Sequence, residues 1–266
     1  MDSKAFQIGP ISIYWYSIMI VLGIIVAFFV ANHEIKRLRL NKEFFINLTF
    51  YTILFGILGA RIYYVLFNLD YYLTYPTEII KIWHGGLAIH GGIFAGVCVI
   101  IYHCKKYKMS ILKVLDICAV SLIIAQAIGR WGNFFNQEAY GFLTSKANLE
   151  SLMIPNFIID GMYINGSYYH PTFFYESLWN ILGFIIMIFL RRRKNNKTGQ
   201  ITGFYMIWYS IGRIAIEQMR MDSLMLGSIK VAQLVSLVFI IVGIIIMVKK
   251  TKKDSKNNLY NVDGEK

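Results

Sequence analysis

The sequence predicts an all-α polytopic membrane protein of about seven transmembrane helices, and three observations support this prediction. Of the 266 residues, 56% are hydrophobic and only 16% are charged, which is too apolar for a soluble domain. The stretches 13–31 and 229–248 are long enough to cross a bilayer and have no charged residue away from their ends. The basic residues are concentrated in alternate connections, which is the positive-inside pattern.

The predicted spans follow from the apolar runs, and the charges between them set the topology. The spans are residues 13–32, 44–67, 86–103, 113–130, 172–190, 200–219 and 229–248. Segments 31–42, 104–113, 191–197 and 249–266 hold four, four, five and six basic residues. Because such segments stay in the cytoplasm, we expect the N-terminus outside and the C-terminus inside. Residues 1–250 then form a single transmembrane domain, and 251–266 a disordered basic tail.

The longest outward connection, residues 131–171, is predicted to form a small external cap. It is mostly polar and aromatic. Within it, Asp160-Gly161 lies between two short apolar runs, which is a signal for a short hairpin.

The net charge is +12 and the chain has three cysteines. The positions of these residues argue against a nucleic-acid-binding protein and against a catalytic cysteine. The positive charge is divided among separate loops, whereas a nucleic-acid-binding surface needs one contiguous basic face. Cys98, Cys104 and Cys118 have no CxxC spacing and no neighbour that would lower a thiol pKa. They are therefore expected to be structural thiols.

The ionisable residues of the spans share one depth on the predicted topology. A charged side chain is costly in hydrocarbon, so each is a candidate functional residue. All map to the outer half of the membrane, although they come from different spans. They are Arg61, His90, Arg130, the segment 170–176, Arg213, Glu217 and Arg220, with Tyr16 at the outer start of the first span.

The sixth span carries a polar stripe. Tyr209, Arg213, Glu217 and Arg220 are separated by steps of four, four and three, which places them on one helical face. A guanidinium matches a phosphate and stays charged, so the stripe suits a phospholipid headgroup. The alternative is a salt-bridge lattice that only holds helices together.

Paired glycines interrupt the start of the third span in the segment HGGLAIHGG, residues 84–92. Such backbone is tolerated at membrane depth where it lines a cavity or packs on protein. Gly92 and Gly96 also form a small-residue packing face. His90 is a candidate base for a thiol because its ordinary pKa lies near neutrality, and the alternative is a structural hydrogen-bonding role.

The segment GRWGNFFNQEAYG, residues 129–141, leaves the fourth span at the outer interface. Interfacial aromatic residues are expected there. The further presence of Arg130, Asn133, Asn136 and Glu138 indicates polar groups that converge on an anionic or ester-rich ligand.

At these residues the chain resembles the prolipoprotein diacylglyceryl transferases, a family of bacterial membrane enzymes. The resemblance covers almost all of the chain except the tail. It runs through Tyr16, GARIYYVLFN at 59–68, HGGLAIHGG at 84–92, GRWGNFFNQEAYG at 129–141, HPTFFYE at 170–176 and the stripe of the sixth span. One departure is His84, where many members are expected to have glutamine or another residue, so His90 is the better candidate.

The resemblance implies transfer of the diacylglyceryl group of phosphatidylglycerol to the lipobox cysteine of prolipoproteins. A thioether forms and glycerol phosphate is released, with no metal and no other cofactor. The implied partners are phosphatidylglycerol and the signal peptides of prolipoproteins, in the bacterial plasma (inner) membrane. Such a displacement needs a thiolate, a stabilised leaving group and exclusion of water.

The residue roles that we expect combine the resemblance with the residue chemistry. Arg130 and Arg213 bind the phosphate, Glu217 orients Arg213, and His90 is the candidate base, with Glu217 as the alternative. Asn133 and Asn136 bind headgroup or glycerol oxygens, Tyr16 closes the pocket, and Glu138 braces the loop. Further substrate-binding candidates are Arg61, Gly141, His170, Tyr175, Tyr209 and Arg220.

A lipid transporter or flippase is the second class of function considered, and a structural scaffold the third. A transporter would show a repeat relating two halves and ionisable groups near the bilayer midplane. A scaffold would have no cluster of ionisable groups at one depth. The sequence has neither the repeat nor a midplane charge pattern, and it does have the cluster.

Overall fold

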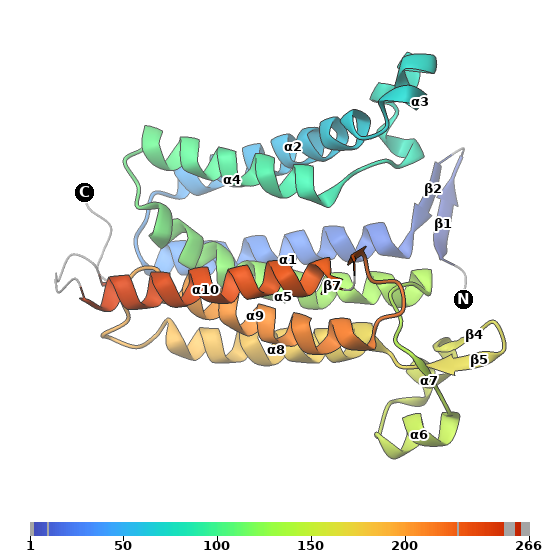
Figure 1. Cartoon of the computed structure of the whole chain (residues 1–266). Coiled ribbons are helices and arrows are strands. Elements are labelled where there is room, and N and C mark those ends of the chain that lie inside the picture. Colours follow the sequence, from blue (N-terminus) through green and yellow to red (C-terminus); the bar gives the residue numbers. More distant parts are fainter. Residues whose placement is uncertain (1–2, 10, 228, 253–258, 262–266) are drawn as a thin grey trace. The chain divides into compact units, whose positions relative to one another are not determined.

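The computed structural model describes residues 3–9, 11–227, 229–252 and 259–261, and this part of the chain is mainly helical (Figure 1). Within these described residues, five helices are long and apolar enough to cross a membrane, which is consistent with the predicted polytopic membrane protein. They are α1 (Trp15–Arg37), α2 (Lys42–Leu66), α5 (Ile111–Asn136), α8 (Thr172–Leu190) and α10 (Val231–Lys252). Two further helices of similar length are α4 (Ile89–Lys106) and α9 (Gln200–Met219), and α9 contains charged residues in its second half.

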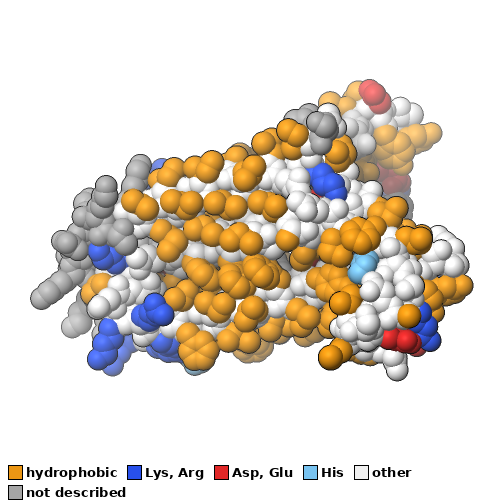
Figure 2. Space-filling view, turned by 60° about the horizontal axis from the view of Figure 1, so that its bottom comes forward, with side chains coloured by type: hydrophobic (Ala, Val, Ile, Leu, Met, Phe, Trp, Pro, Cys, Tyr) orange, Lys and Arg blue, Asp and Glu red, His pale blue; other side chains and the backbone are white. Residues whose placement is uncertain are grey.

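The outward faces of these helices are apolar, as a lipid environment requires. Only 11% of the apolar window of α10 and 17% of that of α1 is buried. Hydrophobic side chains cover much of the face seen in Figure 2. A soluble protein rarely exposes so large an apolar surface.

The chain forms two compact units. The five-helix unit comprises residues 1–33 and 115–262, with most of α1 and α5 and all of α8, α9 and α10. The two-helix unit comprises residues 34–114, with α2 and α4 joined by the short helices α3 (Leu69–Thr74), η1 (Pro76–Ile80) and η2 (Ile82–His84). The single domain expected for residues 1–250 stays a prediction.

Small residues bring α2 and α4 of the two-helix unit into close contact. A Cβ atom added to Gly59 would lie 2.7 Å from the Gly91 carbonyl oxygen, and one on Gly92 would lie 3.2 Å from the Gly56 carbonyl oxygen. Gly92 therefore belongs to a packing face, as predicted. Gly96 is less constrained, because its added Cβ would make an ordinary 3.5 Å contact with the Thr52 side chain.

The segment 131–171 of the five-helix unit forms short helices and strands, which we call the cap, and its predicted external location stays a prediction. It contains α6 (Lys146–Ser151), α7 (Asn156–Gly161) and an antiparallel sheet of order β3-β5-β4, formed by Leu143–Thr144, Ser167–Tyr169 and Tyr163–Ile164. Buried apolar residues of α6, α7 and β4 pack against Phe134 and Phe173, which join the cap to α5 and α8.

A hairpin is present in the cap, but its predicted position was wrong. Asp160 and Gly161 end α7. The turn between β4 and β5 is formed by Asn165 and Gly166, whose φ angles of 49° and 86° suit the left-handed turn of a tight hairpin. The strands therefore begin after the helix that the apolar run 157–159 forms.

Two other hairpins shift the predicted starts of the first and last spans. Strands β1 (Lys4–Ile8) and β2 (Ile11–Tyr14) precede α1, so the first helix begins at Trp15 and not at residue 13. Strands β6 (Met225–Leu226) and β7 (Ile229–Lys230) precede α10 in the same way.

The tail predicted to be disordered is partly ordered. Thr251 and Lys252 belong to α10. Tyr260 is fully buried and its N–H donates to the Asn196 carbonyl over 2.8 Å. Disorder is therefore wrong for residues 251–252 and 259–261, while 253–258 and 262–266 lie outside the described residues.

The glycine packing of α2 on α4 predicts unequal effects of two alanine substitutions. Gly91→Ala should lower stability by about 1–3 kcal/mol, because the new methyl group would overlap the Gly59 backbone. Gly96→Ala is the matched control and should be nearly neutral. Thermal unfolding in detergent measures both, and equal midpoints for the two variants would contradict this packing.

Candidate active site

Helices α5, α8 and α9 are locked together by tryptophan contacts. The Trp179 and Trp208 rings stack with centroids 4.2 Å apart, and each indole N–H donates to the other residue's carbonyl, over 2.9 and 3.1 Å. Gly183 and Gly212 lie beneath these rings, where a Cβ atom would overlap the indoles. From α5, the Trp131 indole donates to the Ser177 hydroxyl over 3.2 Å. These contacts fix the register of the three helices.

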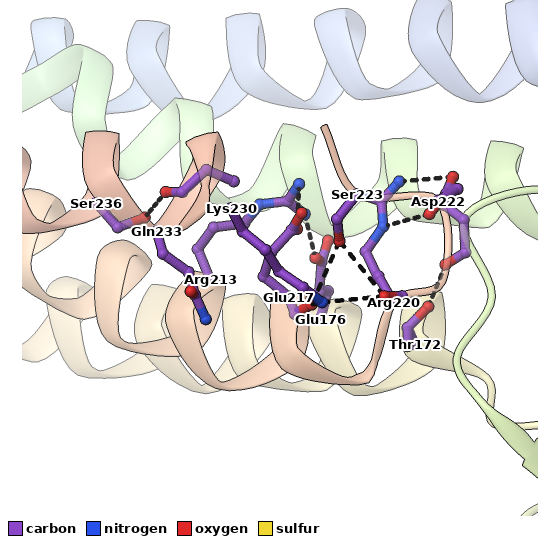
Figure 3. Close-up of polar contacts among 12 residues, drawn as sticks. Thr172, Glu176, Arg213, Glu217, Arg220, Asp222, Ser223, Lys230, Gln233 and Ser236 are labelled. Carbon is purple, nitrogen blue, oxygen red and sulfur yellow. Dashed lines mark hydrogen bonds and ion pairs between the residues drawn. The ribbon is translucent and has the colours of Figure 1, made fainter. Parts of the chain in front are cut away.

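Glu176 on α8 lies between two arginines from the neighbouring helices. Its Oε1 accepts from Nη1 of Arg213 on α9 over 2.7 Å, and its Oε2 contacts Nε of Arg130 on α5. The Glu176 side chain is only 8% exposed, whereas those of Arg130 and Arg213 are 22% and 16% exposed. Two guanidinium groups therefore converge on one buried carboxylate. Figure 3 shows Glu176 together with one of them, that of Arg213.

The stripe predicted on α9 is present for its central pair. Nη2 of Arg213 lies 2.7 Å from Oε2 of Glu217, which is almost completely buried. This contact is an ion pair without the alignment of a hydrogen bond. Tyr209 stacks on Tyr205, with ring centroids 5.9 Å apart.

Arg220 leaves the stripe because α9 ends before it. Its backbone is extended, and its guanidinium donates two hydrogen bonds to Asp222, of 3.0 and 2.9 Å. The pKa of Asp222 is lowered mainly by its hydrogen bond from Arg220. This pair therefore stabilises the fold above the ordinary pKa of an aspartate, and the stabilisation is lost as the pH falls through the lowered value.

Glu138, in the loop after α5, hydrogen-bonds to the end of that helix. Its Oε1 accepts from the side-chain amides of Asn133 and Asn136, over 2.8 and 3.4 Å. In the last turns of α5 the Tyr16 ring of α1 packs on Gly132, leaving no room for a side chain there. In the loop that follows, Gly141 forms an isolated bridge with Arg220. The end of α5 therefore contacts α1, and the loop after it contacts the end of α9.

His170 and Tyr175 bond to each other. Nδ1 of His170 lies 3.1 Å from the Tyr175 hydroxyl, and the His170 carbonyl accepts from the Gly141 N–H over 2.9 Å. Burial lowers the pKa of His170, because desolvation disfavours the charged imidazolium. These contacts favour a role for both side chains in holding the loop.

Arg61 and His90 belong to the two-helix unit. Four N–H groups of Arg61 point at the carbonyls of Ile79, Glu78, Gly85 and Gly86, at 2.5–2.9 Å, which organises the segment 78–86. A cavity of about 370 Å³ lies beside its guanidinium. His90 is exposed, and its ring lies 6.1 Å from that of Tyr63. In the described part of the chain, its ring nitrogens have no hydrogen bond.

The sequence analysis assigned no role of its own to Glu176, which lies in the candidate segment 170–176, and did not select Lys230. Glu176 had a detectable signal, because it is the only acidic residue in the predicted span 172–190. Lys230 lies at the edge of an apolar run, where a cation is unremarkable. Among the described residues, no group of three or more His, Cys, Asp or Glu side chains could hold a metal ion.

Known proteins resemble nearly the whole chain. Residues 3–249 match the family described as prolipoprotein diacylglyceryl transferase. Proteins named phosphatidylglycerol–prolipoprotein diacylglyceryl transferase from Staphylococcus aureus strains MSSA476, MW2 and Newman are each 50% identical over 254 residues. These alignments cover 95% of this chain and 90% of each relative.

The position of Glu176 predicts a large effect of removing its charge. Glu176→Gln should lower stability by about 3 kcal/mol, because two partly buried guanidiniums lose their shared counter-ion. Asp222→Asn is the matched control: it also removes an arginine partner, but its side chain is 52% exposed, so the loss should stay below about 1 kcal/mol. Chemical denaturation in detergent compares the two, and equal losses would contradict a central role for Glu176.

Proposed function

The chain belongs to the prolipoprotein diacylglyceryl transferase family, and on that premise we propose that Arg130 and Arg213 bind the phosphate of phosphatidylglycerol. The chain is an enzyme: it transfers the diacylglyceryl group of phosphatidylglycerol to prolipoproteins, the activity for which its relatives with 50% identity are named. Nothing in the fold or the comparisons favours the flippase alternative.

The assignment of phosphate binding rests on the partners of the Arg130 guanidinium nitrogens. Glu176 holds this guanidinium through Nε. Among the described residues, its terminal nitrogens Nη1 and Nη2 have no protein partner, and the side chain is 22% exposed. Two adjacent terminal nitrogens match two phosphate oxygens geometrically, and the charge of an arginine persists at any physiological pH. Glu176 therefore orients a guanidinium whose outer edge is available to an anion.

Arg213 complements Arg130 in this proposal. Its terminal nitrogens are paired with Glu176 and Glu217. Arg213 is therefore proposed to supply a fixed positive charge beside the phosphate, and not a second pair of nitrogens for bidentate hydrogen bonding. The salt-bridge lattice considered above accounts for these pairs as well. It does not account for the unpartnered outer edge of Arg130.

The proposed roles of the arginines fit the displacement that this reaction requires. The cysteine thiolate attacks the glyceryl carbon that bears the phosphate, a C–S bond forms, and the C–O bond breaks. The electron pair of the C–O bond moves to the phosphate oxygen, so negative charge grows on the leaving glycerol phosphate. Fixed guanidiniums stabilise that charge as it develops, which lowers the barrier to displacement.

His90 is the proposed acceptor of the thiol proton. It is exposed and has no hydrogen bond within the described residues, so its ring can accept a proton. Glu217 is almost completely buried and paired with Arg213, and protonating it would leave that arginine and Arg130 with the Glu176 carboxylate as their shared counter-ion. This contrast supports His90 over Glu217.

The loop after α5 is proposed to bind the headgroup. Both asparagine amides donate to Glu138, which leaves their Oδ1 atoms as the groups that can accept from glycerol hydroxyls. Tyr16 and Tyr209 are proposed to line the same pocket. Gly141 is proposed to allow the close approach of the loop to α8.

The membrane arrangement is part of the proposal. We expect α4 and α9 to cross the bilayer together with the five apolar helices, with the N-terminus outside and the site in the outer half of the plasma membrane. The lengths of α4 and α9 and the distribution of basic residues support this topology.

Replacing either arginine with lysine tests the phosphate role. Arg130→Lys and Arg213→Lys should each reduce transfer at least about tenfold, because lysine keeps the charge but loses the planar fork. The assay follows a lipobox peptide and phosphatidylglycerol in detergent by mass spectrometry. Both variants should still fold and insert. Near wild-type turnover by both would exclude the proposed role.

The pH dependence of two further variants separates the candidate bases. His90→Gln should lose transfer at neutral pH and regain part of it as the pH approaches the ordinary thiol pKa of about 8.5, where thiolate forms unaided. Glu217→Gln should not recover, because it acts by displacing Arg213, whose charge is constant. Transfer rates from pH 6 to 9.5 measure both. A flat residual rate for His90→Gln would assign His90 a structural role.

A further inference from the structure

Lys230 binds the C-terminal end of α9, the helix that carries Arg213 and Glu217. Its ammonium donates to the carbonyl oxygens of Glu217, Arg220 and Gln218, over 2.5, 3.1 and 3.4 Å (Figure 3). An ammonium has three protons and no acceptor, so each proton has one carbonyl. These carbonyls belong to the end of a helix, where carbonyls lack the N–H partner four residues on and the dipole is negative. The Glu217 carbonyl also accepts from the Arg220 N–H over 3.2 Å.

The opposite end of α9 is bound by a side chain of opposite charge. Asp116 on α5 is fully buried and accepts from the backbone N–H groups of Gly199 and Thr202, over 2.6 and 2.8 Å. It also accepts from the Thr202 hydroxyl over 2.6 Å. An anion therefore holds the positive end of the helix dipole, and Lys230 holds the negative end.

The two contacts differ in their distance from the charged cluster. The nearer contact of Asp116, at Thr202, lies eleven residues before Arg213, which is about 16 Å along a helix. The shortest contact of Lys230 is to the carbonyl of Glu217 itself, the residue whose carboxylate pairs with Arg213. Motion of the α9 end would therefore move Glu217 directly and leave the Asp116 end unaffected.

We propose that Lys230 is a positioning residue for the transfer reaction: it fixes the last turn of α9 and thereby the Arg213–Glu217 pair. Lys230 itself has all its protons on carbonyls, so it is not assigned to the substrate. Asp116 holds the same helix without this effect on the reaction. The inference rests on the proposed role of Arg213 in phosphate binding.

The hairpin that carries Lys230 explains how the contact is held. Strands β6 and β7 pair through Met225 with Lys230 and Leu226 with Ile229. The Ser223 hydroxyl lies 3.4 Å from the Arg220 carbonyl oxygen, and the Val231 N–H donates to the Leu224 carbonyl over 2.9 Å. The connection from α9 to α10 thus folds back so that a residue at the start of α10 closes the end of α9.

The test compares Lys230→Met with Asp116→Ala, which removes the contact at the other end of the same helix. Both variants should unfold at a temperature lower by about 2–8 °C. Only Lys230→Met should lose kcat per folded molecule, by about tenfold or more, because a small displacement of a charged group is costly to catalysis. Lys230→Arg keeps the charge and should restore part of this loss, whereas Lys230→Gln should restore less.

The outcomes separate positioning from simple stabilisation. Wild-type kcat in folded Lys230→Met, or an equal loss in Asp116→Ala, would overturn the proposal. If Lys230→Met does not accumulate, the order wild type, Lys230→Arg, Lys230→Gln in kcat supports it, and equal kcat for all three overturns it.

A double-mutant cycle distinguishes this inference from the proposed function. If Lys230 acts through Arg213, Lys230→Met should cost much less in an Arg213→Lys background than in the wild type. Additive losses would overturn the positioning role while leaving the phosphate role intact. Full activity of Arg130→Lys and Arg213→Lys would instead remove the phosphate role, whatever Lys230 does.

Discussion

Two guanidinium groups share the Glu176 carboxylate. The surrounding helices bring these groups together, so that the buried negative charge of Glu176 is balanced by positive charge and not by water. An uncompensated charge in an apolar interior costs several kcal/mol, so a buried carboxylate requires partners at hydrogen-bonding distance. Glu176 has two, from α5 and α9. The three helices cannot shift relative to one another without separating opposite charges, and the site is therefore rigid before any lipid binds.

The apolar contacts around the cluster serve the same end. The stacked indoles of Trp179 and Trp208 fit over Gly183 and Gly212, where no other residue leaves space. Trp131 ties α5 to α8 through Ser177. Without a hydrophobic driving force between helices in lipid, close packing and interhelical hydrogen bonds are the available means of association. Glycine and tryptophan supply both, next to the charged residues that need fixed positions.

Two arginines, Arg61, which is buried, and Arg130, which is partly exposed, illustrate how one residue type takes different roles. Arg61 directs its N–H groups at backbone carbonyls and thereby shapes the loop before α4. Arg130 contacts the Glu176 carboxylate through Nε, and its terminal nitrogens have no partner within the described residues. Arg61 therefore organises a backbone segment, whereas Arg130 is the residue that we propose binds an anion. In the sequence, both residues are cations inside predicted spans, so the sequence did not distinguish their roles.

The sequence by itself determined the helices and most of the charged site. The predicted spans 172–190 and 200–219 coincide with α8 and α9, because long apolar runs have no other way to satisfy their backbone in lipid. The Arg213–Glu217 pair followed from helical spacing, which is a local property. The family resemblance supplied the activity.

Only the tertiary structure decided which groups meet across helices. It paired Glu176 with Arg130 and Arg213, closed the end of α9 with Lys230, and placed the cap turn at Asn165-Gly166 instead of Asp160-Gly161. It also ordered Tyr260 against the connection between α8 and α9. Each of these depends on contacts between residues distant in sequence or on a choice between equivalent local signals. Helical periodicity and hydropathy describe one segment at a time, so they could not determine them.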